Sequence, residues 1–528
     1  MLLRIARRAA PWVALACAFA LLCVFEWRNV GDLLDSDMGS DMIYANLLFK
    51  EGRLLSPSWY YSTELRILHN HLFFTPLFYL TQDWRLVRFL GSVISYVLFL
   101  VSLGCLTRQL GLKRFFPLLG AAFLLPLSEV YFHYTFISTF YTPYLILSFF
   151  LLSLALSQSA PLPPRARAVR LAALGVLSLL TGLSGFRFVI SSALPLTLAA
   201  VVLRLRHPGH ARSGRLLTGS LVCLGTMLAG VAVNLFVLSR IYTFASYSGM
   251  HFTAFSFERV GEFFTGLLAL LGYPAGKPVF SLAPAAAILS LVVPGLGVWS
   301  VARVLRAPRG AVDAPAPSFG EQFLALFVML GTALFLCLAA LTDMELYHYH
   351  FLPIAIYLAP LAAMRLQSLR LPSLRIAAAG GLAVLLGAVC LVNYPYYTRR
   401  DMTYEQRMLL ETLSDEGYTT GYSTFWMGNV LTELSGGEVD MYVLKRPLNT
   451  AQDLLDRVDA WLQLKSHRES PPEGKVFILF SKWYGETDFP LYACLSSGHT
   501  LFESPNFIAL GYDSFDALYA DAQSAPEA

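Results

Sequence analysis

Charged residues are scarce in this sequence. Only 14% of its 528 residues are Asp, Glu, Lys or Arg, whereas 56% are hydrophobic, and the mean hydropathy is +0.56. Soluble globular domains carry about 25% charged residues, so a chain this poor in charge cannot cover a surface that faces water on all sides. The composition therefore excludes an ordinary soluble protein and predicts that the lipid bilayer is its main solvent.

Several motifs are also missing. The seven cysteines give no disulfide framework, because six of them lie inside apolar runs and only Cys494 lies in a polar segment. No P-loop and no Gly-rich dinucleotide fingerprint is present, which argues against nucleotide chemistry. The net charge of +4 is too small to indicate nucleic acid as a partner.

Long apolar runs dominate what is present. About eleven of them are long enough to cross the hydrocarbon core as helices. They cover residues 9–25, 86–106, 115–127, 136–156, 169–183, 188–203, 216–238, 281–301, 323–341, 351–364 and 376–392. Lys and Arg gather in every second loop, as the positive-inside rule requires of cytoplasmic loops. We therefore predict an all-α polytopic protein of the plasma (inner) membrane with a cytoplasmic N-terminus.

The chain divides into two expected parts. Residues 1–393 form the membrane module, with a large first outer loop at about 26–85, and residues 394–528 form a soluble domain. An odd number of spans places that domain outside the cytoplasm. Helical spacing at Glu405–Leu413 and a buried-strand pattern at Lys475–Phe480 predict that it is a small α/β domain. Ala18-Phe19-Ala20 resembles a signal cleavage site, but the apolar run continues to Phe25 and favours a retained anchor.

The first outer loop concentrates carboxylates. Asp32, Asp35, Asp37 and Asp41 lie within ten residues, directly after the first span. Asp35 and Asp37 share one face of an extended segment, whereas Asp37 and Asp41 share one face of a helix. Gly39-Ser40 predicts the cap of a helix from Asp41 to about Lys50. On spacing alone, solvated caps explain these residues as well as a functional site does.

Two motifs resemble a known class of enzymes. Asp35-Ser36-Asp37, followed by an apolar helix and Gly52, is similar to the Asp-Ser-Asp-Glu start of bacterial GT-C glycosyltransferases, with Met38 in place of the second acidic residue. The stretch Tyr347–Pro353 resembles their aromatic-rich motif that ends in Leu-Pro. The resemblance covers about residues 10–395 and implies transfer of a sugar from a polyprenyl-phosphate donor to a glycan, lipid or protein acceptor.

This resemblance also implies roles for individual residues. A carboxylate of the first outer loop acts as general base, with Asp37 as the first candidate and Asp35 as the second. The departing phosphate needs a cation, for which Arg187 is the first candidate and Arg66 and Arg240 are alternatives. Arg187 lies in a very short outer turn where arginine is otherwise scarce. An arginine that snorkels to lipid headgroups explains it at least as well.

Further polar residues near the outer ends of spans are candidates for the same pocket. They are Asp41, Glu129, His133, Asp343, Glu345, His348 and His350. For each histidine, a hydrogen-bonded residue at the membrane interface is the simpler interpretation. Some members of the class use a divalent metal such as Mg²⁺ or Mn²⁺ and others do not, and the sequence is compatible with both.

Two other functions compete with this one. A transporter or flippase would be expected to show repeats and ionisable groups at mid-membrane, but the polar residues here collect near the outer interface. A non-catalytic scaffold of cell-envelope assembly would use the outer domain to bind a partner. The aromatic segment Gly421–Leu434 is compatible either with such a site or with an ordinary core.

Overall fold

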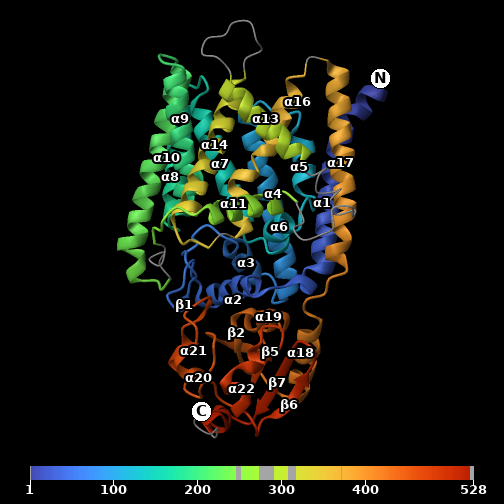
Figure 1. Cartoon of the computed structure of the whole chain (residues 1–528), viewed down its shortest axis with the longest axis vertical. Coiled ribbons are helices and arrows are strands. Elements are labelled where there is room, and N and C mark those ends of the chain that lie inside the picture. Colours follow the sequence, from blue (N-terminus) through green and yellow to red (C-terminus); the bar gives the residue numbers. More distant parts are fainter. Residues whose placement is uncertain are drawn as a thin grey trace.

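The helices form one bundle, and a small sheet lies at one end of it (Figure 1). The structure is a computed structural model and describes residues 2–244, 251–272, 291–306, 317–345, 347–369 and 371–523. The chain begins at the far end of the bundle from the sheet (Figure 1). The first outer loop lies at the end that faces the sheet, so the acidic segment is enclosed between bundle and sheet.

The helical bundle contains the apolar runs. Its helices are α1 (Leu2–Asn29), α4 (Trp84–Gln109), α5 (Phe116–Phe123), α6 (Glu129–Phe132), α7 (Thr142–Gln158), α8 (Pro164–Gly182), α9 (Leu194–Arg206), α10 (Ala211–Phe236), α11 (Phe257–Leu270), α13 (Val292–Arg306), α14 (Phe319–Leu341), α15 (Leu352–Ala355), α16 (Leu358–Gln367) and α17 (Pro372–Thr398). A polytopic helical architecture is confirmed.

The number of spans is lower than expected within the described residues. Seven helices there are long and apolar enough to cross a membrane, or eight if the pair Glu129–Ile137 and Thr142–Gln158, bent by 87°, counts as one span. The expected count of about eleven is thus not confirmed. Helix α5 has only 8 residues, and the run 281–301 lies partly outside the described residues. Helix α8 carries Arg165, Arg167 and Arg170 near its start.

The first outer loop is folded into short elements. They are η1 (Gly31–Leu33), α2 (Ser36–Glu51), β1 (Trp59–Tyr60) and α3 (His71–Phe78). The prediction that a helix starts at Asp41 was wrong, because α2 begins at Ser36. The Asp35 side chain caps it by accepting a hydrogen bond from the Met38 amide at 2.9 Å, whereas the Ser40 hydroxyl donates to the Asp37 carbonyl within the first turn. Asp37 therefore lies in the first turn of a helix.

The C-terminal part contains a five-stranded mixed sheet in the order β3-β2-β5-β7-β6. Its elements are α18 (Tyr404–Glu416), β2 (Thr420–Thr424), α19 (Phe425–Leu434), β3 (Asp440–Leu444), α20 (Asp453–Asp456), β4 (Gln463–Leu464), α21 (Ser466–Glu469), β5 (Val476–Ser481), α22 (Pro490–Cys494), β6 (His499–Glu503), β7 (Phe507–Tyr512) and α23 (Phe515–Gln523). The predicted helix and strand correspond to α18 and β5. Side chains of β5 alternate between two apolar clusters, one on each face of the sheet, which explains why the whole strand is buried.

This C-terminal domain is docked on the first outer loop. Helix α19 packs against α2 so closely that a Cβ on Gly39 would overlap the backbone carbonyl of Asn429. Strand β4 pairs with β1 in a second, two-stranded sheet. Helix α2, with Asp37 in its first turn, therefore contacts both the membrane bundle and the C-terminal domain.

Candidate active site

The acidic segment becomes a cluster around the N-terminal turn of α2. Asp37 lies in that turn, and Asp35, its neighbour, reaches His133 with 3.3 Å between Oδ2 and Nε2. Asp35 also caps the helix. The sequence-predicted residues Asp35, Asp37 and His133 are thus brought together, although His133 comes from the bent span about a hundred residues later.

Asp37 has the electrostatics of a base that works near neutral pH. Burial is the main cause that raises the pKa of its carboxyl group, to about 7, and the negative charge of Asp35 raises it further. The positive charge of Arg66 opposes this shift. A general base functions best when its pKa lies near the working pH, so the environment of Asp37 suits proton abstraction.

Asp41 lies one helical turn further along and is held by residues of the same loop. Asn70 donates a hydrogen bond to Asp41 Oδ2 at 2.9 Å, and Arg66 Nη1 lies 3.8 Å from Oδ1. His69 Nδ1 lies 3.8 Å from Oδ2. Burial lowers the pKa of His69, and likewise of His71, to about 3, so both imidazoles are neutral. Arg66 is the cation closest to Asp41 in this group.

Arg66 itself is held in an unusual conformation. Its φ of +49° lies in the left-handed region that a long side chain rarely adopts. The guanidinium carbon sits 3.9 Å from the centroid of the Phe140 ring, and its Nε is buried without a hydrogen-bond partner among the described residues. Strain of this kind concentrates at functional sites. The arrangement offers one buried donor to an anion.

Arg187 joins the same region through a residue that the sequence did not single out. Its Nε lies 2.6 Å from Glu64 Oε1, and its Nη1 donates to the Tyr141 hydroxyl at 2.9 Å. The Tyr144 hydroxyl donates to the other oxygen of Glu64 at 2.6 Å. Tyr349, from the predicted aromatic motif, packs its ring 4.8 Å from that of Tyr141. Arg187 is thus a partnered, partly exposed cation at the edge of the site.

The other predicted pocket residues have different partners. Glu129 pairs with Arg400 at 3.6 Å, Asp343 accepts a hydrogen bond from the His251 amide at 2.7 Å, and Glu345 accepts one from the Tyr347 hydroxyl. The Nδ1 of His350 is buried without a partner among the described residues. The side chain of His348 lies outside what the structure describes.

A metal finds no ready ligand set. Within the part of the chain that the structure describes, no three His, Cys, Asp or Glu side chains gather closely enough to hold an ion. The cluster at Asp37 contains carboxylates, but a cation already lies among them in the form of Arg66. These residues therefore do not fit a divalent metal, and the chemistry below is assigned to side chains.

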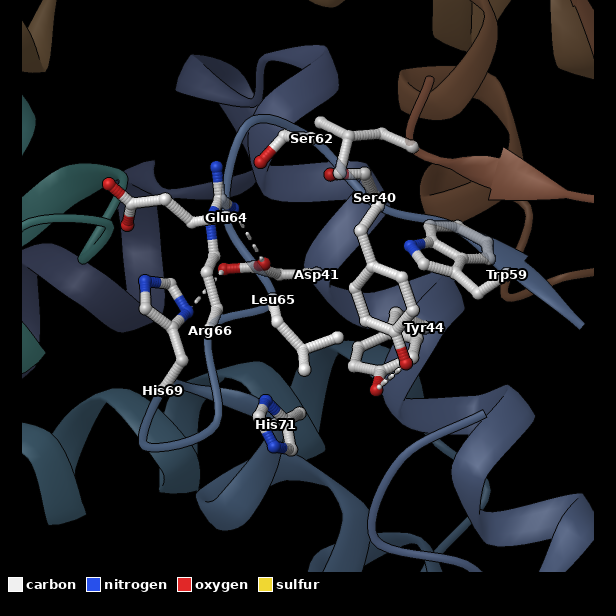
Figure 2. Close-up of a pocket in the computed structure, with 12 residues that line it drawn as sticks. Ser40, Asp41, Tyr44, Trp59, Ser62, Glu64, Leu65, Arg66, His69 and His71 are labelled. Atoms are coloured by element: carbon white, nitrogen blue, oxygen red, sulfur yellow. Dashed lines mark hydrogen bonds and ion pairs between the residues drawn. The ribbon is translucent and has the colours of Figure 1, made fainter. Parts of the chain in front are cut away.

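A cavity opens beside the cluster. It is lined by Ser40, Asp41, Tyr44, Trp59, Tyr61, Ser62, Glu64, Leu65, Arg66, His69, His71 and Leu462. Figure 2 shows Asp41 between Arg66 and His69, with Trp59 and Tyr44 on another side. Carboxylate and guanidinium groups thus face aromatic rings across a small space.

Comparison with solved structures identifies the fold. The crystal structure of apo ArnT from Cupriavidus metallidurans matches 98% of this chain and 100% of its own, at 11% identity and a TM-score of 0.56. ArnT bound to undecaprenyl phosphate matches 94% and 97%, at 15% identity and a TM-score of 0.52. ArnT is a GT-C glycosyltransferase. This chain has the GT-C fold. No protein-family model and no curated protein sequence matches it.

A third solved structure shows a weaker likeness. The Archaeoglobus fulgidus oligosaccharyltransferase, tethered with an acceptor peptide, matches 97% of this chain and 75% of its own, at 12% identity and a TM-score of 0.49. The fold assignment rests on the two ArnT structures, whose TM-scores exceed 0.5. The expected GT-C resemblance is thereby confirmed at the level of the fold.

Sequence reasoning assigned no role to several residues of this candidate site. Glu64 and His71 lie in the first outer loop, and Leu462 lies in the C-terminal domain. A signal for Glu64 was present, because a carboxylate two residues before Arg66 in a membrane-facing loop is uncommon. His71 is part of His69-Asn70-His71, a polar group next to an apolar run. Nothing in the local sequence of Leu462 marks it.

Proposed function

We propose that this protein is a membrane glycosyltransferase that transfers a sugar from a polyprenyl-phosphate donor to an acceptor outside the cytoplasm, with Asp37 as general base. The observation that carries the proposal is the position of Asp37 in the first turn of α2, beside the pair of Asp35 and His133, where burial raises the pKa of its carboxyl group. The GT-C fold supports it, since a solved protein of this fold, ArnT, is bound to undecaprenyl phosphate. The acceptor class is a glycan, a lipid or a protein.

The reaction is a single displacement. Asp37 takes the proton of the acceptor hydroxyl, the hydroxyl oxygen forms a bond to the anomeric carbon of the donor sugar, and the bond from that carbon to the phosphate oxygen breaks. The polyprenyl phosphate leaves with the electron pair. One displacement inverts the anomeric centre, unlike the two-step route through a covalent intermediate. An environment that raises the pKa of Asp37 strengthens it as a base.

The leaving phosphate needs a fixed positive charge. We assign this role to Arg66 first, because its buried Nε has no partner among the described residues and its guanidinium lines the cavity. Arg187 takes a supporting role, since Glu64 and Tyr141 already bind it. This order reverses the expectation from the sequence, in which Arg187 was the first candidate.

The site faces away from the cytoplasm in this proposal. The basic loops and the N-terminus lie at the end of the bundle opposite the sheet, as Figure 1 shows for the N-terminus and for the connection between α9 and α10. The positive-inside rule places that end in the cytoplasm. The cluster at Asp37 and the C-terminal domain then lie at the outer face of the plasma membrane.

The test uses purified protein in lipid vesicles. Wild type, Asp37→Asn and Asp32→Asn are supplied with radiolabelled polyprenyl-phosphate sugars and an acceptor-containing membrane extract. Asp32 is a matched control, because it lies in the same loop but pairs with Arg407 at 3.0 Å. We expect Asp37→Asn to lower the transfer rate by about 10²–10⁴-fold. Asp32→Asn should retain the rate of wild type.

Each other outcome changes the proposal. If a folded Asp37→Asn protein transfers as fast as wild type, Asp37 is not the base, and Asp35→Asn becomes the variant to measure. If wild type transfers no sugar from any donor, the glycosyltransferase proposal fails, and a transporter or a scaffold becomes the better explanation.

A further inference from the structure

Helix α17 packs closely against the rest of the bundle only near the sheet. There the side-chain amide of Asn393 donates to the Pro126 carbonyl at 3.0 Å, and the Tyr397 hydroxyl donates to the Glu129 carbonyl at 2.8 Å. Toward the opposite end of the helix, none of the residues 371–388 is buried. Protein therefore leaves this half of an apolar, membrane-length helix largely uncovered, and its side chains face lipid.

An apolar cavity lies beside the uncovered half of α17. Its volume is about 90 Å³, and its lining residues come from α5 and the residue before it, α13, α16 and α17. All of these lining residues are apolar and six are alanines, whose small side chains leave space between the helices. Ala383 in its wall is exposed, so the cavity opens at the surface of the bundle. Water does not fill an apolar cavity of this kind, whereas an apolar ligand does.

Two arginines lie where the cavity approaches the basic end of the bundle. Arg375 is in the first turn of α17, one turn before the lining residue Ala379, and that turn contains no acidic residue. Its Nη2 donates to the Leu369 carbonyl at 2.7 Å, whereas its Nε is buried without a hydrogen-bond partner among the described residues. In the last turn of α16, the Nε of Arg365 is buried and unpartnered in the same sense. Buried donors need a partner, and the start of a helix favours an anion.

The loop before α5 adds two more cations at this end. Lys113 and Arg114 are exposed and directly precede the lining residue Phe115. The side-chain amide of Gln367 donates to the Gly111 carbonyl at 3.4 Å, which joins this loop to the end of α16. Figure 1 shows α5, α13, α16 and the start of α17 at the end of the bundle opposite the sheet. The cavity thus has positive charge at one end and apolar walls along its length.

The length of the cavity matches one leaflet of a bilayer. Leu386 is the lining residue farthest from Arg375 along α17, and at the helical rise the two lie about 16 Å apart. Half of the hydrocarbon core of a bilayer is about 15 Å thick. A lipid chain that starts at a phosphate beside Arg375 would therefore end near the middle of the membrane. Basic pockets between membrane helices bind anionic lipid headgroups in this way.

We propose that this cavity binds an anionic phospholipid, with its phosphate on Arg375 and Arg365 and one acyl chain between α17 and the bundle. The site lies at the end of the bundle opposite Asp37, so the inference does not depend on the proposed function. With the N-terminus in the cytoplasm, the lipid belongs to the inner leaflet. The acyl chain supplies the packing that the described protein residues do not give to this half of α17.

The experiment measures lipid binding to the full chain. The protein is purified in detergent, stripped of bound lipid and titrated with phosphatidylglycerol or phosphatidylethanolamine of identical acyl chains, and native mass spectrometry gives each Kd. Arg375→Gln removes a headgroup cation, and Ala379→Phe fills the cavity. The matched controls are Arg165→Gln, an exposed arginine in the first turn of α8, and Ala377→Phe, an exposed residue of α17 outside the cavity lining. Thermal unfolding checks that each variant is folded.

We expect wild type to bind phosphatidylglycerol more tightly than phosphatidylethanolamine. Arg375→Gln should weaken binding of phosphatidylglycerol by about fivefold, the effect of one arginine near an anionic headgroup. Ala379→Phe should weaken binding of both lipids, because its ring takes the place of the acyl chain. Both controls should bind as wild type does.

Four results would overturn the inference. Wild type could bind both headgroups equally, or folded Arg375→Gln and Ala379→Phe proteins could bind phosphatidylglycerol as wild type does. If Arg165→Gln weakens binding as much as Arg375→Gln, the basic surface attracts the lipid and the cavity has no role. If polyprenyl phosphate displaces phosphatidylglycerol at equal concentration, the cavity holds the carrier lipid of the donor instead of a phospholipid. None of these results requires transfer activity, so the proposed function is tested separately.

Discussion

The contact between the C-terminal domain and the membrane bundle gives a sharp stability prediction. Arg88 in α4 forms a buried ion pair with Glu433 in α19, in which Nη2 lies 2.6 Å from Oε2 and Nε reaches Oε1. The same Nη2 donates to the Met38 carbonyl at 2.8 Å, one residue after Asp37. The side chains are 3% and 5% exposed, so water cannot replace either partner. The perturbation is Glu433→Gln, which keeps the shape and removes the charge.

The magnitude follows from the burial of the pair. With Glu433 neutral, the Arg88 guanidinium stays buried with a carbonyl and an amide in place of a carboxylate. Removing one partner of a buried ion pair costs about 3–5 kcal/mol of stability, because the remaining charge is uncompensated. The free energy of unfolding of a protein is about 5–15 kcal/mol, so the effect should be large.

The assay is thermal unfolding of purified protein in detergent, with Asp32→Asn as control. Asp32 pairs with Arg407, but these side chains are 39% and 38% exposed, and an exposed pair contributes about 0–1 kcal/mol. A third variant, Arg88→Met with Glu433→Leu, removes both charges and should recover most of the stability. The reasoning is refuted if Glu433→Gln unfolds at the temperature of Asp32→Asn, or if the double variant is no more stable than Glu433→Gln.

Three further predictions concern α2. Gly39→Ala should lower the unfolding temperature, because the added Cβ would overlap the Asn429 carbonyl at a cost of about 1–3 kcal/mol; an unchanged temperature would contradict the packing of α19. Transfer should fall as the pH drops below about 7, where Asp37 gains a proton, and Asp35→Asn should move this limb of the kcat/KM profile to lower pH, because the Asp35 charge raises the pKa of Asp37. Since the pKa of Asp37 is higher in the folded state, the stability of wild type falls as the pH rises toward 7 and stays low above it. Asp37→Asn should therefore unfold at a higher temperature than wild type at pH 8, with a gap that narrows toward pH 5; a gap independent of pH would contradict the raised pKa.

The architecture could be predicted from the sequence because it depends on local patterns of hydrophobic and charged residues. Apolar runs and the alternation of basic loops predict a helical membrane protein with few assumptions, and the patterns at α18 and β5 predict their elements directly. The predicted start of α2 was wrong because the sequence offers two possible caps. Asp35 and Gly39-Ser40 are both good caps, and the choice of Asp35 depends on the docking of the helix start against α19, which no local pattern contains.

Only part of the candidate site could be predicted from the sequence, because its ion pairs join segments that are distant in sequence. Asp37 and Asp41 share a face of α2 through helical periodicity, and Asp35 joins them as the N-cap of the same helix. The partner of Arg187 is Glu64, 123 residues away, and no spacing rule selects it. An arginine in a short outer turn predicts a cation at the interface, but whether a lipid phosphate or a carboxylate binds it depends on the fold. In the proposed reaction we therefore assign the first phosphate role to Arg66, whose backbone conformation and unpartnered Nε are properties of the folded loop.

The C-terminal domain reaches α2 with two different kinds of contact. Glu433 forms an ion pair with Arg88, and Arg88 donates a hydrogen bond to the Met38 carbonyl. The backbone carbonyl of Asn429 packs against Gly39. Its side-chain amide donates a hydrogen bond to the Leu462 carbonyl. Helix α19 thus packs on the start of α2 and also contacts Leu462, which lines the cavity beside Asp41. Because both contacts lie within two residues of the proposed base, a displacement of α19 would also displace the base. The position of the first turn of α2 therefore depends on the docking of the C-terminal domain.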